Sequence, residues 1–435
     1  MNRSSRLRVL AVCHNYPRRS APGAGLFSHA LHLGLRDHGI DVEVLQLADW
    51  APPWPASALL PAWRANRAHR RDLLPALDGI TFHHPETVEP RPSRLFPGDV
   101  WQRQVRALVR YCAARPALRG VDAVIGHFMV PDGYHALGLA RALGVPALSM
   151  AWGDDVHAWP AQHSTWRDRL RVVLSGVDVP IACSEQLATD ANEWLDSPRD
   201  DWEVVYAGVQ LDRFRPAVSS AVHRNEAFPA HPELAAPDAR VLLMLAQPVL
   251  AKGYLDVLDA WAATAPGAPG WHLVMAGGNW GNVDVEREIA SRGLGGRAHW
   301  LGALAPEAIP ELLRASDAFV LPSHGEGLSI SVLEAMATGL ATVATDVGGH
   351  AEVIRDGREG WLVPPRDSAA LAAALADVTA RPDERVRRGR LARAAAERVG
   401  TPSDNAARLA SVIRRAVGAH AGDAESSTAA ARARG

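Results

Sequence analysis

The chain has 435 residues, with 46 Lys and Arg against 48 Asp and Glu and a net charge of -2. A hydrophobic fraction of 48% with 22% charged residues indicates a globular protein and excludes a disordered or fibrous one. The length favours two domains, and the near-zero charge argues against a dedicated nucleic-acid binder. Lys252 is the single lysine among the basic residues, which makes it the first candidate for a functional role.

The cysteines and the lengths of the apolar runs indicate the cellular compartment of the protein. Cys13, Cys112 and Cys183 show neither a CxxC motif nor Cys/His ligand spacing, so the sequence predicts no disulfide framework and no zinc site. No apolar run reaches the roughly 18–20 residues that a membrane span needs. The N-terminal apolar stretch follows several Arg residues, but it lacks a small-residue cleavage site and is predicted to be a buried strand. We therefore expect a soluble, cytoplasmic protein.

Short apolar runs alternate with helical stretches along most of the chain. In the first half the predicted strands are Arg8–Cys13, Val42–Leu47, Ala123–Gly126, Pro146–Met150, Val179–Ala182 and Glu203–Tyr206. In the second half they are Val241–Ala246, His272–Ala276, Ala298–Leu301, Ala318–Leu321, Ala341–Ala344 and Gly360–Val363. Apolar spacing predicts helices over Leu26–Asp37 and Leu328–Ala337. This alternation predicts an α/β fold with two parallel sheets, each covered by helices on both faces.

Composition changes suggest where the domains begin and end. We expect a first domain over residues 1–216, followed by a polar, Pro-containing linker over 217–239. The second domain is predicted over residues 240–398. A helix over 399–418 is expected to return to the first domain, and the small, polar tail over 419–435 is expected to be disordered.

A basic, Trp-rich segment marks the first domain. Residues 1–120 hold 17 Arg and 9 acidic residues, a net charge of +8, and Trp50–Arg71 combines three Trp with a cluster of Arg. Such a segment can contact an anionic membrane surface, with Trp at the headgroups and Arg on the lipid phosphates. The alternative is an ordinary solvated helix beside a Pro-rich loop.

The densest group of chemically informative residues runs from Leu321 to Gly339. A predicted strand ends where this segment begins, glycines then form a turn, and a helix is predicted to begin near Gly327. Backbone N–H groups at a helix start favour an anion such as a phosphate. Glu326 lies in the turn and Glu334 about two turns into the helix. Because two carboxylates would repel a phosphate, they are expected to accept hydrogen bonds from sugar or ribose hydroxyls.

This string resembles the retaining glycosyltransferases of family four, which have the two-domain GT-B fold of Rossmann-like, doubly wound parallel-sheet domains. The family's Glu-x7-Glu pair, in a PSxxEG and LEAMAxG setting, is Glu326 and Glu334 here. The resemblance extends from Tyr16 to about Pro365. Further matching positions are Gly23, Gly25, His127, Asp155, Lys252 and Gly277.

The resemblance implies a role for each matching residue. Lys252 would neutralise the donor diphosphate, Glu334 would hold the nucleotide ribose, and Glu326 would hold the transferred sugar. His127 would act near the reacting sugar, in catalysis with Glu326 and Lys252. The remaining donor-binding positions are expected to be Gln247, Gly277, Gly327, Leu328 and Ser329.

Gly23, Gly25 and Asp155 are expected in the loops of the first domain. For three of the positions a purely structural role is the alternative: Lys252 as an exposed residue at a helix start, His127 as a buried core histidine, and Asp155 as a helix cap or loop carboxylate.

The resemblance also implies the substrates. A nucleotide-diphosphate sugar would be the donor, bound by the second domain, and a saccharide or lipid-linked saccharide would be the acceptor, bound by the first. Neither a metal nor a cofactor is expected, because Lys252 and backbone N–H groups can stabilise the leaving diphosphate.

Three positions depart from the family pattern. Gln247 stands where the family usually has Arg, and Trp152 and Ala207 replace the usual His and Asn. An Arg binds phosphate with a permanent charge, whereas Gln offers only a neutral hydrogen bond. A weakened or non-catalytic nucleotide-sugar-binding protein is therefore the alternative, and a nucleotide-sugar epimerase is a less favoured one.

Overall fold

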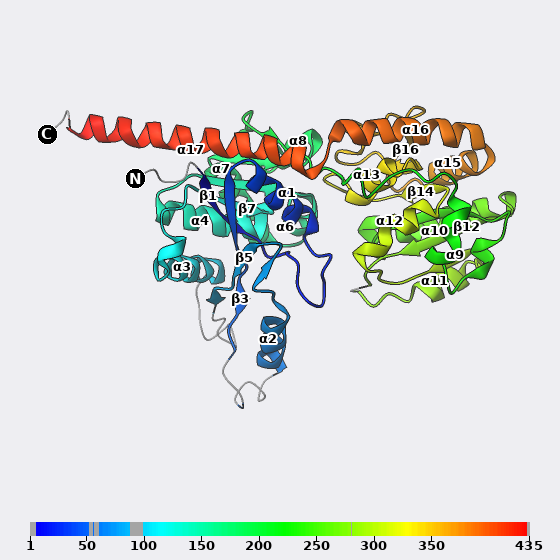
Figure 1. Cartoon of the computed structure of the whole chain (residues 1–435), viewed down its shortest axis with the longest axis horizontal. Helices are drawn as coiled ribbons and strands as arrows, with labels where there is room; N and C mark the ends of the chain where they lie inside the picture. The colour runs from blue at the N-terminus through cyan, green and yellow to red at the C-terminus, as the bar shows by residue number, and fades with distance from the viewer. Residues whose placement is uncertain (1–5, 52–54, 56–60, 88–98, 280, 433–435) are drawn as a thin grey trace. The chain divides into compact units, whose positions relative to one another are not determined.

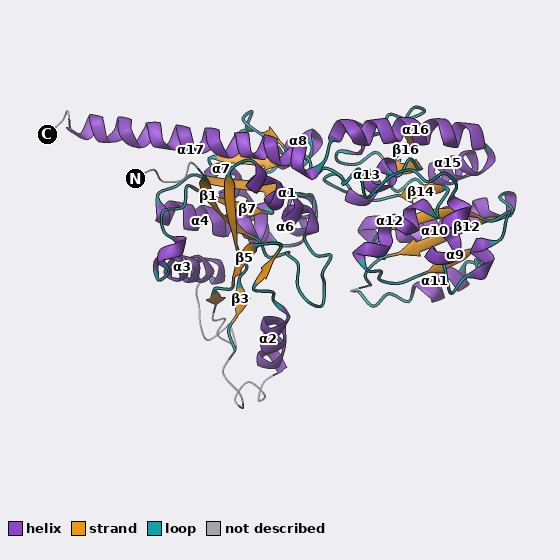
Figure 2. Ribbon diagram, viewed as in Figure 1, coloured by secondary structure: helices purple, strands orange, loops and turns teal. Residues whose placement is uncertain are grey.

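A computed structural model describes residues 6–51, 55, 61–87, 99–279 and 281–432. The chain forms two compact units. Unit 1 comprises Met1–Cys183, Leu187–Val205 and Ser403–Gly435, and unit 2 comprises Ser184–Gln186 and Tyr206–Pro402. Strands and helices alternate through both units (Figures 1 and 2).

Unit 1 is built on an eight-stranded sheet in the order β10-β9-β8-β7-β1-β2-β5-β4. Its strands are β1 (Leu7–Val12), β2 (Ile40–Leu45), β4 (Ala76–Leu77), β5 (Ile80–His83), β7 (Ala123–His127), β8 (Ala147–Ala151), β9 (Val179–Ala182) and β10 (Glu203–Val204). All neighbours pair in parallel except β4 with β5. Every residue of β7 and β8 is buried. These strands are mostly apolar, as expected of strands covered by helices on both faces, with His127 and Ser149 as buried polar exceptions.

The helices of unit 1 follow its strands. They are α1 (Leu26–Asp37), α2 (Pro61–Asp72), α3 (Val100–Ala113), α4 (Tyr134–Leu143), α5 (Asp154–His157), α6 (Trp159–Gln162), α7 (Ser164–Gly176), α8 (Glu185–Asn192) and α17 (Pro402–Arg432). A separate parallel pair joins β3 (Ala48–Asp49) to β6 (Glu86–Thr87).

Unit 2 is built on a six-stranded, fully parallel sheet in the order β13-β12-β11-β14-β15-β16. Its strands are β11 (Arg240–Leu245), β12 (Trp271–Ala276), β13 (Ala298–Trp300), β14 (Ala318–Leu321), β15 (Ala341–Thr345) and β16 (Gly360–Val363). The helices are α9 (Arg224–Ala227), α10 (Tyr254–Thr264), α11 (Val285–Ser291), α12 (Ile309–Arg314), α13 (Ile330–Ala337), α14 (His350–Val353), α15 (Ser368–Ala380) and α16 (Pro382–Val399). Two parallel sheets covered by helices confirm the predicted α/β class.

Residues 217–239 differ from the predicted linker. They carry two short 3-10 helices, η5 (Ser220–His223) and η6 (Pro232–Ala235), and α9 between them, all within unit 2. Arg224 is only 1% exposed; its guanidinium pairs with Asp317 at 2.6 Å and donates to the Ala239 carbonyl at 2.6 Å. The polar composition misled the prediction because the buried Arg224–Asp317 pair, the Ser220 hydroxyl bound to Asp317 and the buried Leu234 all hold the segment to the domain.

The C-terminal segment is helical well beyond the prediction. The helix predicted over 399–418 is present and returns to unit 1 as predicted, but it is part of the longer α17, which runs from Pro402 to Arg432 (Figure 1). The disordered tail predicted over 419–435 is therefore wrong for residues 419–432, and residues 433–435 lie outside the described residues. Its Arg414 donates to the His38 carbonyl, and Arg415 pairs with Glu203. The tail is rich in Ala, the strongest helix former, which favours continuing the helix.

The predicted membrane segment lies partly outside the described residues, at 52–54 and 56–60. Its described part is largely α2, which has no buried residue and carries His69, Arg70 and Arg71 in its last turn. Arg70 pairs with Glu86 at 2.5 Å. Within the described residues, no helix is both long and apolar enough to cross a bilayer. Contact with a membrane surface stays a prediction.

Candidate active site

In unit 2 the two candidate catalytic side chains meet after β14. Lys252, in the turn before α10, places its Nζ 2.7 Å from Oε1 of Glu326. The Ser323 hydroxyl donates to the same oxygen at 2.6 Å. The Glu326 side chain is 10% exposed and that of Lys252 is 26% exposed. The single lysine of the chain and the first Glu of the motif therefore form a mostly buried ion pair.

The backbone around this pair needs glycine. Gly253 has φ +68°, and a Cβ there would lie 2.0 Å from the Pro322 carbonyl oxygen. The His324 N–H donates to the Ala251 carbonyl at 2.8 Å, which fixes the Lys252 turn against the end of β14. Gly348, with φ +51°, packs in the same way against the backbone of Glu326. A side chain at either glycine would force these loops apart.

The charge of Glu326 is stabilised by its surroundings. Burial alone would raise the pKa of this carboxyl, but the Lys252 charge and the hydrogen bonds from Lys252 and Ser323 outweigh burial and lower it. Glu326 is therefore ionised at neutral pH, and the Lys252 ammonium neutralises it. The carboxylate remains a strong acceptor for hydroxyl groups.

Glu334 has the opposite electrostatic state. It lies within α13, where burial raises the pKa of its carboxyl to about 8 against a smaller opposing effect of the Arg213 charge. At neutral pH Glu334 is largely a neutral acid, which can donate as well as accept a hydrogen bond. The two carboxyl groups therefore differ: Glu326 is paired with a cation, whereas burial raises the pKa of Glu334. That both accept hydrogen bonds from sugar or ribose hydroxyls stays a prediction.

The start of α13 differs by three residues from the prediction, and Gly327 and Leu328 lie in the preceding loop. This loop is fixed because the Gly327 carbonyl accepts from the Gly349 N–H at 2.6 Å. Ser329 occupies the N-cap position, but its side chain does not cap the helix. Its hydroxyl lies 3.0 Å from Nε2 of His350, whose Nδ1 lies 2.9 Å from the Thr345 carbonyl.

His350 explains the unusual N-cap. Burial lowers its pKa, so the ring is neutral, donates from Nδ1 to Thr345 and accepts from Ser329 at Nε2. The Ser329 side chain makes no capping hydrogen bond to the first turn of α13, whose N–H groups keep their capacity to bind an anion. Sequence reasoning missed His350, for which its place just after Gly348 and Gly349 is the available signal.

Gln247 and Gly277 follow neighbouring parallel strands. A Cβ on Gly277 would lie 2.0 Å from the Ala246 carbonyl oxygen and 3.0 Å from the Gln247 nitrogen, so the loops after β11 and β12 are in backbone contact. Both loops lie at the carboxyl end of the sheet, where α/β folds bind ligands. The structure thus groups Gln247, Gly277, Lys252, Glu326 and the first turn of α13 within unit 2.

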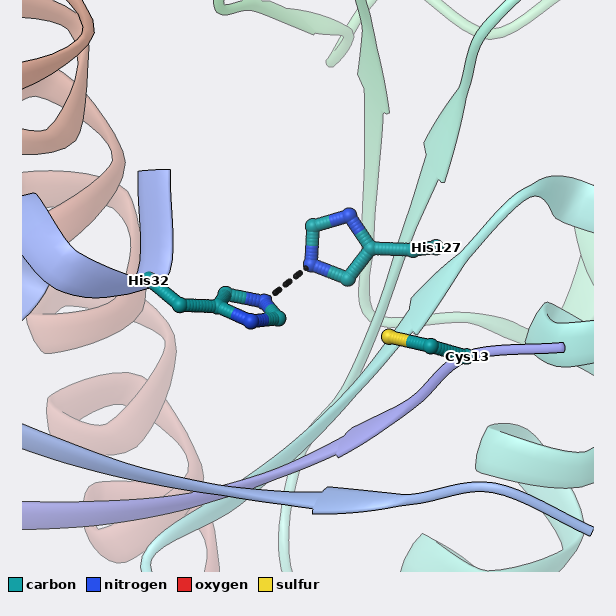
Figure 3. Close-up of side chains that lie close together, drawn as sticks. All are labelled: Cys13, His32 and His127. Atoms are coloured by element: carbon teal, nitrogen blue, oxygen red, sulfur yellow. Dashed lines mark hydrogen bonds between the residues drawn. The ribbon is translucent and has the colours of Figure 1, made fainter. Parts of the chain in front are cut away.

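In unit 1, His127 ends β7 and lies in a buried histidine cluster. Its Nε2 lies 2.7 Å from Nε2 of His32, with Cys13 beside the pair (Figure 3). Burial lowers the pKa of His127 to about 3, so its ring is neutral. Among the described residues, Nδ1 of His127 has no hydrogen-bond partner. No spacing in the sequence indicates this grouping of Cys13 with two histidines, which the fold alone produces.

A chain of hydrogen bonds fixes the rings behind His127. The Tyr16 hydroxyl lies 2.8 Å from Nδ1 of His32 and 3.0 Å from Nδ1 of His29, whose Nε2 lies 3.0 Å from Asp78. Because the Asp78 carboxylate can only accept, His29 donates to it, Tyr16 donates to His29, and His32 donates to Tyr16. Nε2 of His32 then accepts from Nε2 of His127, which holds the His127 ring in one tautomer.

The three predicted loop positions of unit 1 have different surroundings. Gly23 is exposed in the loop before α1. Gly25 has φ +62°, and a Cβ there would lie 2.2 Å from the Asn15 carbonyl oxygen. Asp155 is buried and accepts backbone N–H bonds from Met129 at 2.6 Å and Gly153 at 2.9 Å. Its carboxylate therefore holds together the loops after β7 and β8.

A cavity of about 300 Å³ lies beside the ends of β1 and β7 in unit 1. His14 reaches it with Nδ1 3.0 Å from Oδ2 of the buried Asp132, while Trp101 and Trp166 supply aromatic walls. Burial would lower the His14 pKa, but the Asp132 charge and hydrogen bond outweigh it and raise the pKa. Sequence analysis did not single out this pair; a His directly after the first strand was the available signal.

Comparison with known proteins assigns both units. The Glycosyltransferase Family 4 model matches residues 21–213, and the model of glycosyl transferases group 1 matches residues 229–395. TuaC of Bacillus subtilis (strain 168), by its name a teichuronic acid biosynthesis glycosyltransferase, is 22% identical over 85% of this chain and 88% of its own. The D-inositol 3-phosphate glycosyltransferase of Streptomyces scabiei is 29% identical over 54% of this chain; the match spans about half of that relative.

Solved structures share the fold. Sucrose-phosphate synthase from Thermosynechococcus elongatus superposes with a TM-score of 0.74 at 20% identity, over 95% of this chain and 100% of the other. HepE of Anabaena, in complex with UDP and glucose, has a TM-score of 0.70 at 17% identity, over 94% and 100% of the two chains. The chain is therefore a glycosyltransferase of the GT-B fold, with a Family 4 domain followed by a glycosyl transferases group 1 domain.

Proposed function

We propose that the protein transfers a sugar from a nucleotide-diphosphate sugar to a saccharide or lipid-linked acceptor, with retention of the anomeric configuration and without a metal or cofactor. The observation that carries the proposal is the Lys252–Glu326 ion pair beside the uncapped first turn of α13. The complex of HepE with UDP and glucose supports a uridine nucleotide among the candidate donors.

The donor would bind in unit 2. Lys252 and the first N–H groups of α13 would stabilise the diphosphate, while Glu334 would bind the ribose and Glu326 the transferred sugar. Lys252 then bridges Glu326 and the diphosphate, so that one cation serves two anionic groups. Gln247, Gly277, Gly327, Leu328 and Ser329 would complete the donor site, largely through their backbone.

Charge stabilisation would drive the reaction. The bond from the anomeric carbon to the diphosphate oxygen breaks, and the acceptor oxygen forms the new bond on the same face of the sugar. The acceptor's proton passes to the departing diphosphate. Negative charge develops on the diphosphate oxygens, where Lys252 and the α13 N–H groups stabilise it. A neutral His127 would hydrogen-bond the reacting sugar without adding charge.

The acceptor would bind in unit 1. The cavity with His14, Asp132 and two Trp side chains offers the aromatic walls and the few polar groups typical of a saccharide site. The loops of Gly23, Gly25 and Asp155 would shape its surroundings.

Turnover of a donor panel tests the proposal. Purified protein is incubated with UDP-, GDP- and ADP-sugars, and release of the nucleoside diphosphate is measured with and without saccharide acceptors. Nuclear magnetic resonance of the product then gives its anomeric configuration. Failure to bind or hydrolyse every donor would contradict the activity, whereas an inverted product would contradict only retention.

The neutral Gln247 favours one alternative, a nucleotide-sugar-binding protein with weak or no catalysis. Comparing Glu326→Ala with the wild type in both binding and turnover discriminates between the two. An enzyme loses turnover, whereas a binding protein has none to lose. An epimerase would instead convert the donor sugar in the absence of any acceptor.

We also propose contact between the Trp50–Arg71 segment and the cytoplasmic face of an anionic membrane. Sedimentation with phosphatidylglycerol vesicles at low salt, and loss of sedimentation at high salt, is the expected result. Arg67→Gln with Arg71→Gln should weaken it, whereas Arg390→Gln with Arg398→Gln on α16 serves as the matched control. Equal sedimentation of the two double variants would contradict a role for this segment.

A further inference from the structure

A second histidine cluster lies in unit 2, on the edge strand of its sheet. His231 and Glu233 flank the start of η6, and His299 lies on β13, the outermost strand. Oε1 of Glu233 lies 3.2 Å from Nδ1 of His231 and 3.5 Å from Nδ1 of His299. The donor atoms of the three residues all lie within 4.8 Å of one another. Three donor groups thus converge from two segments that are distant in sequence.

The distances match those of metal ligands. Bonds of about 2.0–2.1 Å from tetrahedral Zn²⁺ to nitrogen and oxygen place neighbouring ligand atoms about 3.3–3.5 Å apart. The two separations to Glu233, 3.2 and 3.5 Å, are close to this size. The rings of His231 and His299 meet at 70° with their centroids 4.9 Å apart, and the ligand atoms of all three residues lie within 4.8 Å of one another.

The ligand types suit a cation. Two imidazoles and one carboxylate are a ligand set that Zn²⁺ uses in proteins.

His272 contacts the His299 ring from the side away from Glu233. Its Nδ1 lies 3.2 Å from Nε2 of His299, whose Nδ1 faces Glu233. When Nδ1 of His272 accepts from Nε2–H of His299, Nδ1 of His299 carries the lone pair that a cation requires. His272 would then be the outer partner that metal-bound histidines commonly have.

The site is both anchored and accessible. Leu234, beside the ligands, is fully buried and holds η6 in place. The side chains of Glu233 and His231 are 44% and 27% exposed, whereas that of His299 is 6% exposed. A metal ion can therefore reach the triad from solvent, and water can fill its fourth position.

We propose that His231, Glu233 and His299 bind one Zn²⁺ and that His272 positions His299. The ion would tie η6, in the segment 217–239, to the edge strand of unit 2. This role is separate from the proposed sugar transfer, because none of these residues belongs to the donor site.

Zinc titration of the full chain tests the site. The protein is purified without a polyhistidine tag, treated with a chelator, and titrated with Zn²⁺ against a chromophoric chelator. One equivalent of Zn²⁺ should bind, Co²⁺ should give the visible bands of a tetrahedral site, and Mg²⁺ should not compete. Absence of any stoichiometric Zn²⁺ binding would overturn the proposal.

Variants locate the ion. Glu233→Gln should weaken Zn²⁺ binding at least about 10-fold, as loss of a ligand exceeds the loss of an outer partner. Glu226→Gln, an exposed carboxylate in the same segment, is the matched control and should bind as the wild type does. His272→Gln should weaken binding about 10-fold without changing the melting temperature of the metal-free protein.

The cluster of Cys13, His32 and His127 in unit 1 is the competing location. Cys13→Ser should leave Zn²⁺ affinity unchanged if the ion binds at Glu233. Binding that persists at full strength in Glu233→Gln would overturn the proposal, and its loss in Cys13→Ser would place the ion in unit 1 instead.

Discussion

At the scale of single residues, Lys252 has the sharpest expected effect. Lys252→Ala removes a charge from the diphosphate and leaves the mostly buried Glu326 without its cation. We expect kcat/KM to fall about 10²–10³-fold, the usual cost of losing one preorganised donor at developing charge. Lys252→Arg should retain part of the activity, because it restores the charge with a different geometry.

A substitution at Gln247 should have the opposite effect and strengthen binding of the diphosphate. Gln247→Arg should lower the Kd for a nucleoside diphosphate about 10-fold, since a charged hydrogen bond replaces a neutral one. Isothermal titration with UDP, GDP and ADP measures the change in Kd, and steady-state kinetics measures the change in kcat/KM for the Lys252 variants. A Lys252→Ala variant with undiminished turnover would remove the lysine from the mechanism.

Glu334 makes stability depend on pH. Its pKa is about 8 in the folded protein and about 4.5 in an unfolded chain, so the folded state holds a proton that the unfolded state releases. The stability it contributes is fully present below about pH 4.5 and is lost as the pH rises through 8. Urea unfolding at pH 5, 6.5 and 8 should show the wild type losing stability relative to Glu334→Gln. Parallel pH profiles of the two proteins would contradict a raised pKa.

At the scale of secondary-structure elements, the turn before α10 depends on Gly253. Gly253→Ala combines a strained positive φ with a clash against the Pro322 carbonyl, and it displaces Lys252. Gly293→Ala is the matched control, because Gly293 has φ +67° with no atom within 4 Å of a Cβ. Gly293→Ala should lower the free energy of unfolding by about 1 kcal/mol. Gly253→Ala should lower it by more and should also weaken donor binding. Equal effects in denaturant unfolding would show that the close approach is unimportant.

At the scale of the whole molecule, α17 completes unit 1 from the far end of the chain. Its Leu409 and Ile413 are fully buried, one turn apart on the same helix face. Leu409→Ala should lower the free energy of unfolding by about 2–5 kcal/mol, as for other large-to-small core changes. Ser411→Ala, on the exposed side, should change it by less than about 0.5 kcal/mol. Thermal unfolding by circular dichroism compares the two variants. Because the chain forms two compact units, we expect two transitions, of which only the one of unit 1 shifts.

Periodicity predicted the repeated strands and helices well because parallel strands buried on both faces are continuously apolar. All twelve predicted strands correspond to strands of the structure, with ends shifted by up to a few residues. The short strands β3 to β6 were missed, because pairs of two to four residues with one polar face have no distinct pattern. Residues 217–239 were misread because a buried Arg224–Asp317 pair is indistinguishable in sequence from surface charge.

The sequence by itself determined the α/β class, the positions of the main strands, and the candidate status of Lys252, Glu326 and Glu334. These follow from local patterns and motif spacing, which are written along the chain. Tertiary structure alone decided that Lys252 neutralises Glu326 and that burial keeps Glu334 protonated. It also brought His299 to His231 and Glu233. Charge pairing and burial depend on which side chains are in contact in the folded protein, and the separation of two residues along the chain does not indicate whether they are.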